Sequence, residues 1–262
     1  MNQRALSAVA WALLIVPANA AYVVTTTQGE ESNLQHTFSA TDLLHGKLPT
    51  SFFPGLLFGQ EQAWHPQNTD PLDRFPAFTD GIGMRATGLT GLLRDFPASA
   101  PPAFRSPYAV QVVYTLDSVQ DLGELRIFSG NNGRDGRVFH TYVVEFSTDG
   151  TFPANTISDD VYVQSHQSGT LNNASKLPEP GFTDWRCVET SLTHTSGTLA
   201  TGVKAVRISL FPVDNTGGQM RDPYDGINQY TGIDDQLTAA FVSPLIWEID
   251  LFKTSPVKSI SG

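Results

Sequence analysis

The sequence feature that most limits the possible folds is a series of short segments in which apolar and polar residues alternate with a period of two. In VQVVYTL, Val112 and Tyr114 lie on the same face, and in LIWEIDLF, Trp247 and Ile249 share one face while Glu248 lies on the other. Successive side chains of a strand point to opposite faces of a sheet, so this alternation is typical of half-buried strands. The predicted strands are 110–116, 123–129, 141–147, 160–165, 184–192, 203–211 and 245–252.

Turn-forming residues connect these segments, and helical periodicity is scarce. Many short strands joined by Gly, Pro, Asn and Asp form the pattern of a β-sandwich or jelly roll. We therefore expect an all-β fold, an antiparallel two-sheet β-sandwich whose alternating faces close on one core. The inward faces are expected to include Val112, Tyr114, Phe146, Val206, Ile208, Trp247 and Ile249.

The composition is compatible with one large domain. Hydrophobic residues make up 40% of the 262 residues, which is enough for a sizeable core. The proline-rich stretch 95–107 is the best candidate for a break between domains. It is too short to separate two cores, so we expect it to be a surface crossover.

The N-terminus has the three parts of an export signal. The stretch MNQR carries one positive charge, an apolar run of about a dozen residues follows, and PANA ends in an Ala-x-Ala pattern before Ala21. A bilayer span needs about 20 apolar residues, so the run is too short to be a membrane anchor, and no later segment is apolar enough. We expect a secreted or periplasmic (extracellular) protein without a transmembrane segment after signal removal. The expected organisation is a signal peptide over 1–20, a single domain with an N-terminal extension over 21–252, and a polar tail over 253–262.

The charge and cysteine content limit the partners and the means of stabilisation. Lys and Arg total 16 against 26 Asp and Glu, a net charge of −10, so the chain lacks the basic surface that nucleic acid or an anionic membrane requires. Cys187 is the only cysteine, which rules out an internal disulfide. Its strand-like surroundings predict a small buried thiol rather than a nucleophile, because no helix start or nearby His lowers its pKa.

Sequence signatures of enzymes are missing. The chain contains no HExxH, no G-x-S-x-G, no P-loop and no dinucleotide-binding glycine fingerprint, and its six histidines never fall at metal-ligand spacing. We therefore expect a non-catalytic binding protein. Hydrolysis by a pair of carboxylates stays an alternative, because 26 acidic residues allow some pair to meet in space.

Four segments in a fixed order resemble a known family. VQVVYTLDSVQDLGELRIFSGNN, YVVEFSTDGTF, GVKAVRISLFP and WEIDLF are similar to the ordered signature of discoidin-like domains, also called coagulation factor 5/8 type C domains. The resemblance covers about residues 78–252. It implies a jelly roll of the galactose-binding-like kind, and an extracellular glycan or other cell-surface component as the ligand. An extracellular structural or adhesion protein that binds a protein partner is the alternative from another class.

The resemblance also implies a structural Ca²⁺ ion. FTDG and WEIDLF occupy the two places where the family supplies cation ligands. Asp80 and Glu248 would be the carboxylate ligands, and backbone carbonyls around Thr79, Gly83 and Ile246 would complete the oxygen shell that Ca²⁺ prefers. An ordinary turn at Asp80 is the competing interpretation, since Asp-Gly is common chain punctuation, and the polar residues usual after the family's Asp-Gly are replaced here.

Ligand contacts are expected from loops at one end of the sandwich. The long segment 211–241 separates two predicted strands by far more than a hairpin needs, so it is either functional or a solvated insertion. Aromatic rings can stack on a sugar face, and Arg or Asn can bond its hydroxyl groups. The candidate ligand-binding residues are Asn131, Asn132, Arg134, His140, Trp185, Arg221, Tyr224 and Tyr230.

Overall fold

The fold is taken from a computed structural model of the chain. It describes residues 21–30, 39–53, 63–95, 110–131, 136–153, 156–157, 161–169, 186–213 and 220–255. The predicted signal peptide, and all but the first residues of the predicted polar tail, lie outside these ranges.

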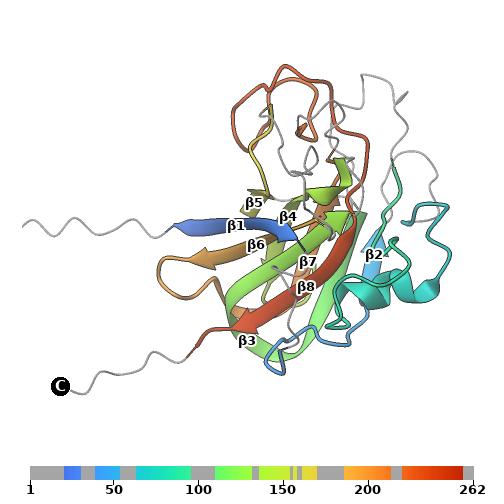
Figure 1. The fold of residues 1–262 in the computed structure, drawn as a ribbon. Coiled ribbons are helices and arrows are strands. Elements are labelled where there is room, and N and C mark those ends of the chain that lie inside the picture. The colour runs from blue at the N-terminus through green and yellow to red at the C-terminus, as the bar shows by residue number, and fades with distance from the viewer. Residues whose placement is uncertain are drawn as a thin grey trace, which may run out of the picture.

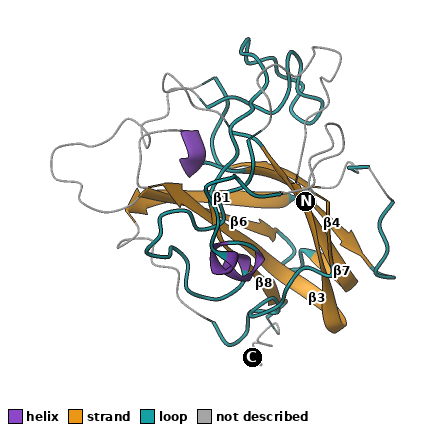
Figure 2. Cartoon of the chain, turned by 90° about the vertical axis from the view of Figure 1, so that its right-hand side faces the viewer, coloured by secondary structure: helices purple, strands orange, loops and turns teal. Residues whose placement is uncertain are grey.

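Strands make up nearly all the regular structure, as Figure 1 shows. Among the described residues, helix is confined to three short 3₁₀ turns (Figure 2), η1 (Pro71–Asp73), η2 (Phe75–Phe78) and η3 (Gly136–Val138). The strands are β1 (Tyr22–Glu30), β2 (Ser51–Phe53), β3 (Val110–Asn131), β4 (Thr141–Ser147), β5 (Val161–Gln164), β6 (Arg186–His194), β7 (Ala200–Phe211) and β8 (Ile246–Lys253). The all-β prediction is confirmed at this level.

Every strand pairing is antiparallel, and β3 joins the pairings together. This 22-residue strand merges two of the predicted strands. Its first half pairs with β2 and β7, and its second half runs between β6 and β8. The strands therefore form one curled, nearly barrel-like sheet in the order β1-β6-β3-β7-β4-β5, with β2 and β8 added on β3. The predicted division into two sheets is not confirmed, because β3 carries the hydrogen bonding from one side of the core to the other.

The core fills the inside of the curled sheet. Its main cluster draws on residues from Leu44 to Leu251, so distant parts of the chain share one interior. Of the residues predicted to face inward, Val112, Tyr114, Val206, Ile208 and Ile249 are fully buried in this cluster. Phe146 is half-buried against it.

Trp247 is the exception among the predicted inward residues. It is buried, but it belongs to a separate cluster with Phe128 and Cys187 instead of the main core that holds Ile249. The pairing of β3 with β8 steps from Phe128↔Glu248 to Ser129↔Ile246, which leaves Trp247 as an extra residue. A bulge of this kind interrupts the period-two alternation, so simple alternation predicted the wrong neighbours for Trp247.

The sequence patterns missed the first strand. β1 begins directly after the expected cleavage site, in YVVTTTQGE, where β-branched residues are frequent but do not alternate with polar ones. It pairs with β6 from Tyr22↔His194 to Glu30↔Arg186. Cys187 is buried, as its strand context predicted.

Candidate functional site

The ends of several strands meet at one end of the curled sheet. Ser129, near the end of β3, contacts the Nδ1 atom of His140 just before β4 at 2.5 Å, and the N–H of Ser165 after β5 donates to the carbonyl of His140 at 3.0 Å. The long segment between β7 and β8 joins the same end, since the N–H of Gly169 donates to the carbonyl of Met220. In Figure 1 this segment, in orange to red, lies above the sheet. The candidate ligand residues that the structure describes come from this end.

His140 lies in the interior rather than at the surface. Its side chain is fully buried, and its two ring nitrogens lie 2.5 Å from Ser129 Oγ and 2.8 Å from Thr190 Oγ1. Burial, with a smaller contribution from His166, lowers the pKa of His140 to about 3. The imidazole is therefore neutral at pH 7, and it links β3, β4 and β6 where a surface ligand would not reach it.

Three tyrosines form a cluster at the loop end. The rings of Tyr162 and Tyr230 stack in parallel, with centroids 4.6 Å apart and an interplanar angle of 3°. Tyr224 meets Tyr230 edge to face at 6.3 Å. The side-chain amide of Asn228 donates to the Tyr162 hydroxyl at 3.0 Å. Tyr162 was missed from the sequence, since a tyrosine within a strand is unremarkable until the fold places it beside the long loop.

Turn geometry shapes the loop that carries these rings. Asn228 Oδ1 accepts hydrogen bonds from the N–H groups of Tyr230 and Thr231, and the buried Asp222 accepts one from the N–H of Tyr224. Burial raises the pKa of Asp222 to about 6, with Asp235 adding to the rise. The segment is thus an ordered structure in its described part, held by side chains that hydrogen-bond their own backbone.

The remaining candidate ligand residues are less closely grouped. Asn131 is largely buried at the end of β3, and Arg221 is half-exposed and donates to Thr238 Oγ1 at 3.0 Å. Asn132, Arg134 and Trp185 lie outside the described residues.

Arg137 connects three loops at the same end. Its guanidinium forms a two-pronged ion pair with Asp95, at 2.6 and 2.7 Å, and donates to the carbonyl of Ser243 at 3.0 Å. Asp95 also accepts a hydrogen bond from the Ser243 N–H. The fork geometry of Arg suits this triple role, and it fixes the segment that precedes β8 against the segment that ends at Asp95.

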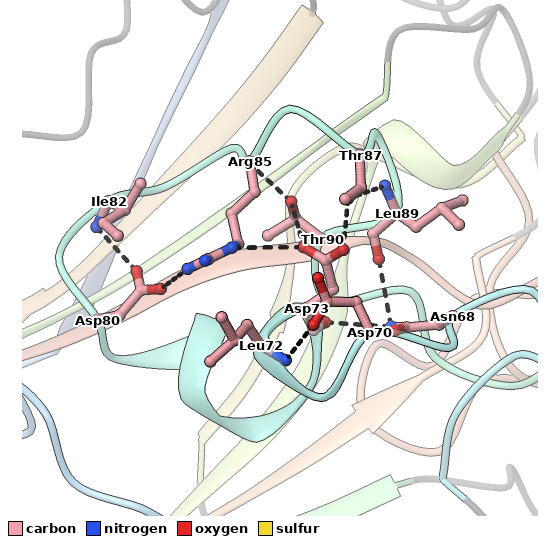
Figure 3. A network of polar contacts seen from close by, with 10 residues as sticks. All are labelled: Asn68, Asp70, Leu72, Asp73, Asp80, Ile82, Arg85, Thr87, Leu89 and Thr90. Atoms are coloured by element: carbon pink, nitrogen blue, oxygen red, sulfur yellow. Dashed lines mark hydrogen bonds and ion pairs between the residues drawn. The ribbon is translucent and has the colours of Figure 1, made fainter.

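Asp80 forms a turn and an ion pair. Asp80 Oδ1 accepts a hydrogen bond from the N–H of Ile82 at 2.9 Å, while Oδ2 lies 2.8 Å from Arg85 Nη1 (Figure 3). Gly81 and Gly83 both have positive φ, at 75° and 74°, which favours glycine at these positions. The turn predicted from Asp-Gly is therefore present, and the carboxylate has a guanidinium as its partner.

Arg85 also faces the buried Asp73. Its Nε lies 3.7 Å from Asp73 Oδ1, and Asp73 accepts hydrogen bonds from the hydroxyls of Thr87 and Thr90. The amide of Asn68 donates to backbone carbonyls on both sides of the loop, including that of Asp73 at 3.1 Å. Figure 3 shows how these contacts cross-link the segment from Asn68 to Thr90.

Glu248 meets this loop from the sheet. Its carboxyl group is buried, and Oε2 accepts a hydrogen bond from the N–H of Gly81 at 3.0 Å. Oε1 is buried without a hydrogen-bond partner among the described residues. Burial, together with repulsion from Asp250, Asp80 and Asp42, raises the pKa of Glu248 to about 9. At pH 7 this carboxyl group holds a proton unless a cation is bound beside it.

The surroundings of Glu248 agree with a Ca²⁺ ion in part. The unpartnered Oε1 and the nearby Asp80 are oxygen donors of the kind Ca²⁺ prefers. The carbonyl of Thr79 already accepts a hydrogen bond from Gly46, and Ile246 packs against Gly91 so closely that a Cβ there would lie 1.6 Å from the Ile246 oxygen. Within the described ranges, no group of three or more His, Cys, Asp or Glu side chains is arranged to hold a metal ion.

Comparison with known proteins finds no match to a family model, to a curated protein or to a solved structure. In the part of the chain that the structure describes, no helix has the length and apolar character needed to cross a membrane. The class that the fold itself defines is an all-β protein built from one curled antiparallel sheet, with tyrosines gathered at its loop end.

Proposed function

We propose that the chain is an exported, non-catalytic protein that binds carbohydrate at the loop end of its sheet. We further propose that the curled sheet is a variant of the galactose-binding-like jelly roll. The observation that carries the proposal is the parallel stack of Tyr162 and Tyr230, with Tyr224 edge-on beside it. Export rests on residues 1–20, whose n-region, apolar run and Ala-x-Ala site have the form of a signal peptide.

The tyrosine cluster has the chemistry that sugar recognition needs. Aromatic rings offer an apolar face to the C–H side of a pyranose, and their hydroxyl groups can bond sugar hydroxyls. Tyr230 and Tyr162 are partly buried, and Asn228 holds the Tyr162 ring in place through its amide. A pre-ordered platform of this kind lowers the conformational entropy lost on binding.

A glycan array probed with the purified exported chain, with and without Ca²⁺, tests the proposal. We expect binding that free sugar competes away and that Tyr230→Ala reduces at least tenfold. Phe52→Ala is the matched control, because Phe52 is an exposed aromatic residue on β2 and does not belong to the tyrosine cluster. Absence of glycan binding together with capture of a protein partner would favour an adhesion protein instead. Release of reducing sugar from a bound glycan would favour a hydrolase.

We also propose that Ca²⁺ stabilises the fold at Glu248 and Asp80 without contacting the ligand. The support is the buried, unpartnered Oε1 of Glu248 close to three further carboxylates. A divalent cation there would bind the ionised carboxylate and offset the repulsion from Asp80, Asp250 and Asp42. Arg85 shares its single positive charge between Asp80 and Asp73, which leaves the charge at Glu248 for the ion.

A further inference from the structure

β1 is attached to the fold by one edge only. It pairs with β6 over nine residues, and among the described strands it has no other neighbour. Every residue from Tyr22 to Gln28 is exposed, with Tyr22 at 49% and Val24 at 41%, and no β1 residue belongs to a described core cluster. β1 therefore has an open edge and two solvent-exposed faces.

The direction of each backbone group on β1 follows from one hydrogen bond. The N–H of Thr195 donates to the carbonyl of Ala21, directly before the register Tyr22↔His194. Hydrogen-bonded and non-hydrogen-bonded pairs alternate along an antiparallel ladder. The backbone groups of Val23 and Thr25 therefore point toward β6, and those of Val24 and Thr26 point toward the open edge.

The alternation of inward and outward backbone groups can be followed from β1 through β6 and β3 to β8, and the hydrogen bonds at the outer edge of β8 agree with it. It places the backbone groups of Leu251 on the outer edge of β8, and there the N–H of Leu251 donates to Asp42 Oδ1 and its carbonyl accepts from Leu43. β8 is thus covered by a preceding segment of the chain. Within the described residues, no hydrogen bond of this kind is recorded for the outward groups of Val24 and Thr26.

The open edge lacks the features that keep natural edge strands apart. Edge strands are commonly protected by a charged residue, a proline or a bulge. Residues 22–29 contain no charged residue and no proline, and their pairing with β6 runs without a register shift. Gln28 contacts His166 at 2.8 Å, so the clear stretch of the edge runs from Tyr22 to Thr27.

We propose that this edge is an interface for a second copy of the chain, whose β1 pairs with it in the antiparallel direction. Two copies related by a two-fold axis present the same spacing of outward N–H and carbonyl groups to one another. The charges agree as well: each chain carries a net charge of −10, yet β1 is uncharged up to Glu30. In an antiparallel pair the two Glu30 positions fall at opposite ends of the joint strands, so no carboxylates face each other.

Sedimentation analysis over a wide concentration range tests the interface. The chain is expressed whole in an export host, and the N-terminus of the purified protein is determined by mass spectrometry. We expect a concentration-dependent dimer. Thr26→Pro removes an outward N–H and should weaken dimerisation at least tenfold without lowering the melting temperature of the monomer. Thr26→Val is the matched control, because it keeps both the N–H and the branched side chain, and it should dimerise normally.

A second variant keeps the conclusion independent of proline effects. Val24→Lys leaves the backbone intact and places like charges close together at the centre of the joint, so it should also give a monomer. A wild-type chain that stays monomeric at every concentration would overturn the proposal, and so would a dimer that persists in both variants. Dimerisation lost equally in Thr26→Val would show that the side chain, not the edge, makes the contact.

Discussion

β1 and β8 flank the pair formed by β6 and β3, one on each side, and they differ in how far they are buried and in whether their outer edge is covered. β8 is buried from Ile246 to Leu251, and its outer edge is covered by Asp42 and Leu43. β1 is exposed from Tyr22 to Gln28, and no described strand lies on its outer edge. The same hydrogen-bonding geometry thus serves two purposes, because burial on β8 stabilises the monomer while exposure on β1 leaves donors and acceptors for a partner.

The comparison teaches that stability and recognition are separated in this fold. Buried apolar area provides most of the free energy of folding, and β8 supplies it through residues such as Ile249 and Leu251. β8 also carries a feature that costs stability, the buried carboxyl group of Glu248. Substitutions on β8 should therefore change the unfolding free energy, whereas substitutions on β1 should change association.

The largest effect is expected in the buried half of β8. Ile249→Ala removes three carbons from a fully buried side chain in the main core, which should lower the free energy of unfolding by about 2–5 kcal/mol. Urea denaturation followed by tryptophan fluorescence measures it. A loss below about 0.5 kcal/mol would contradict the contrast between β8 and β1.

Ca²⁺ binding at Glu248 should have the next largest effect. An ion at about 100 times its Kd stabilises the folded state by about 2.7 kcal/mol, so chelation should lower the melting temperature by about 5–10 °C. Asp80→Ala should melt like the chelated protein and ignore added Ca²⁺. Asp70→Ala is the control, since Asp70 only caps the nearby 3₁₀ turn and should leave the Ca²⁺ response intact. Equal melting temperatures in chelator and in millimolar Ca²⁺ would show that this ion does not bind.

Glu248→Gln tests the same carboxyl group without an ion. Because the folded pKa of Glu248, about 9, lies above its ordinary value of 4.5, its contribution to stability is complete below about pH 4.5 and is lost as the pH rises through about 9. In chelator, the neutral Gln should match the wild type near pH 5 and exceed it by more than about 1 kcal/mol near pH 9, because each unit by which the folded pKa exceeds the unfolded pKa corresponds to about 1.4 kcal/mol. The measurement is thermal unfolding of both proteins from pH 5 to 9. Parallel curves would mean that Glu248 has no unusual pKa.

The smallest effect is expected on the exposed strand. Val24→Ala removes two methyl groups that are already in contact with water, so the free energy of unfolding of the monomer should change by less than about 0.5 kcal/mol. Urea denaturation measures it, at a protein concentration well below the range in which the dimer forms. A larger loss would show that β1 contributes to the core and would weaken the case for a free edge.

Much of the strand content could be predicted from alternation, and the exceptions have local causes. The predicted strands from residue 110 onward all overlap observed ones, because half-buried strands show their period in the sequence. The bulge at Trp247 places its side chain in another cluster. The position of this bulge depends on the pairing with β3, so the hydrophobic pattern of the sequence does not indicate it. β1 escaped prediction because a strand exposed on both faces needs no alternation.

The candidate site shows the same division. Tyr224, Tyr230 and Asp80 were predicted as functional from their residue types and loop positions, and they lie in ordered turns. His140 looked equally available in the sequence but is buried, because three strands meet around its ring. Tyr162 joined the cluster only when β5 came beside the long loop that carries Tyr230.

The sequence by itself determined the all-β class, the acidic character and the turn at Asp80, because these depend on composition and on neighbours a few residues away. The tertiary structure decided that the sheet is continuous, that Glu248 is buried beside three other carboxylates, and that β8 is covered while β1 is open. The physical reason is that burial, pKa and edge exposure are properties of contacts between residues far apart in the chain. Gly81 and Glu248, 167 positions apart, meet only after folding.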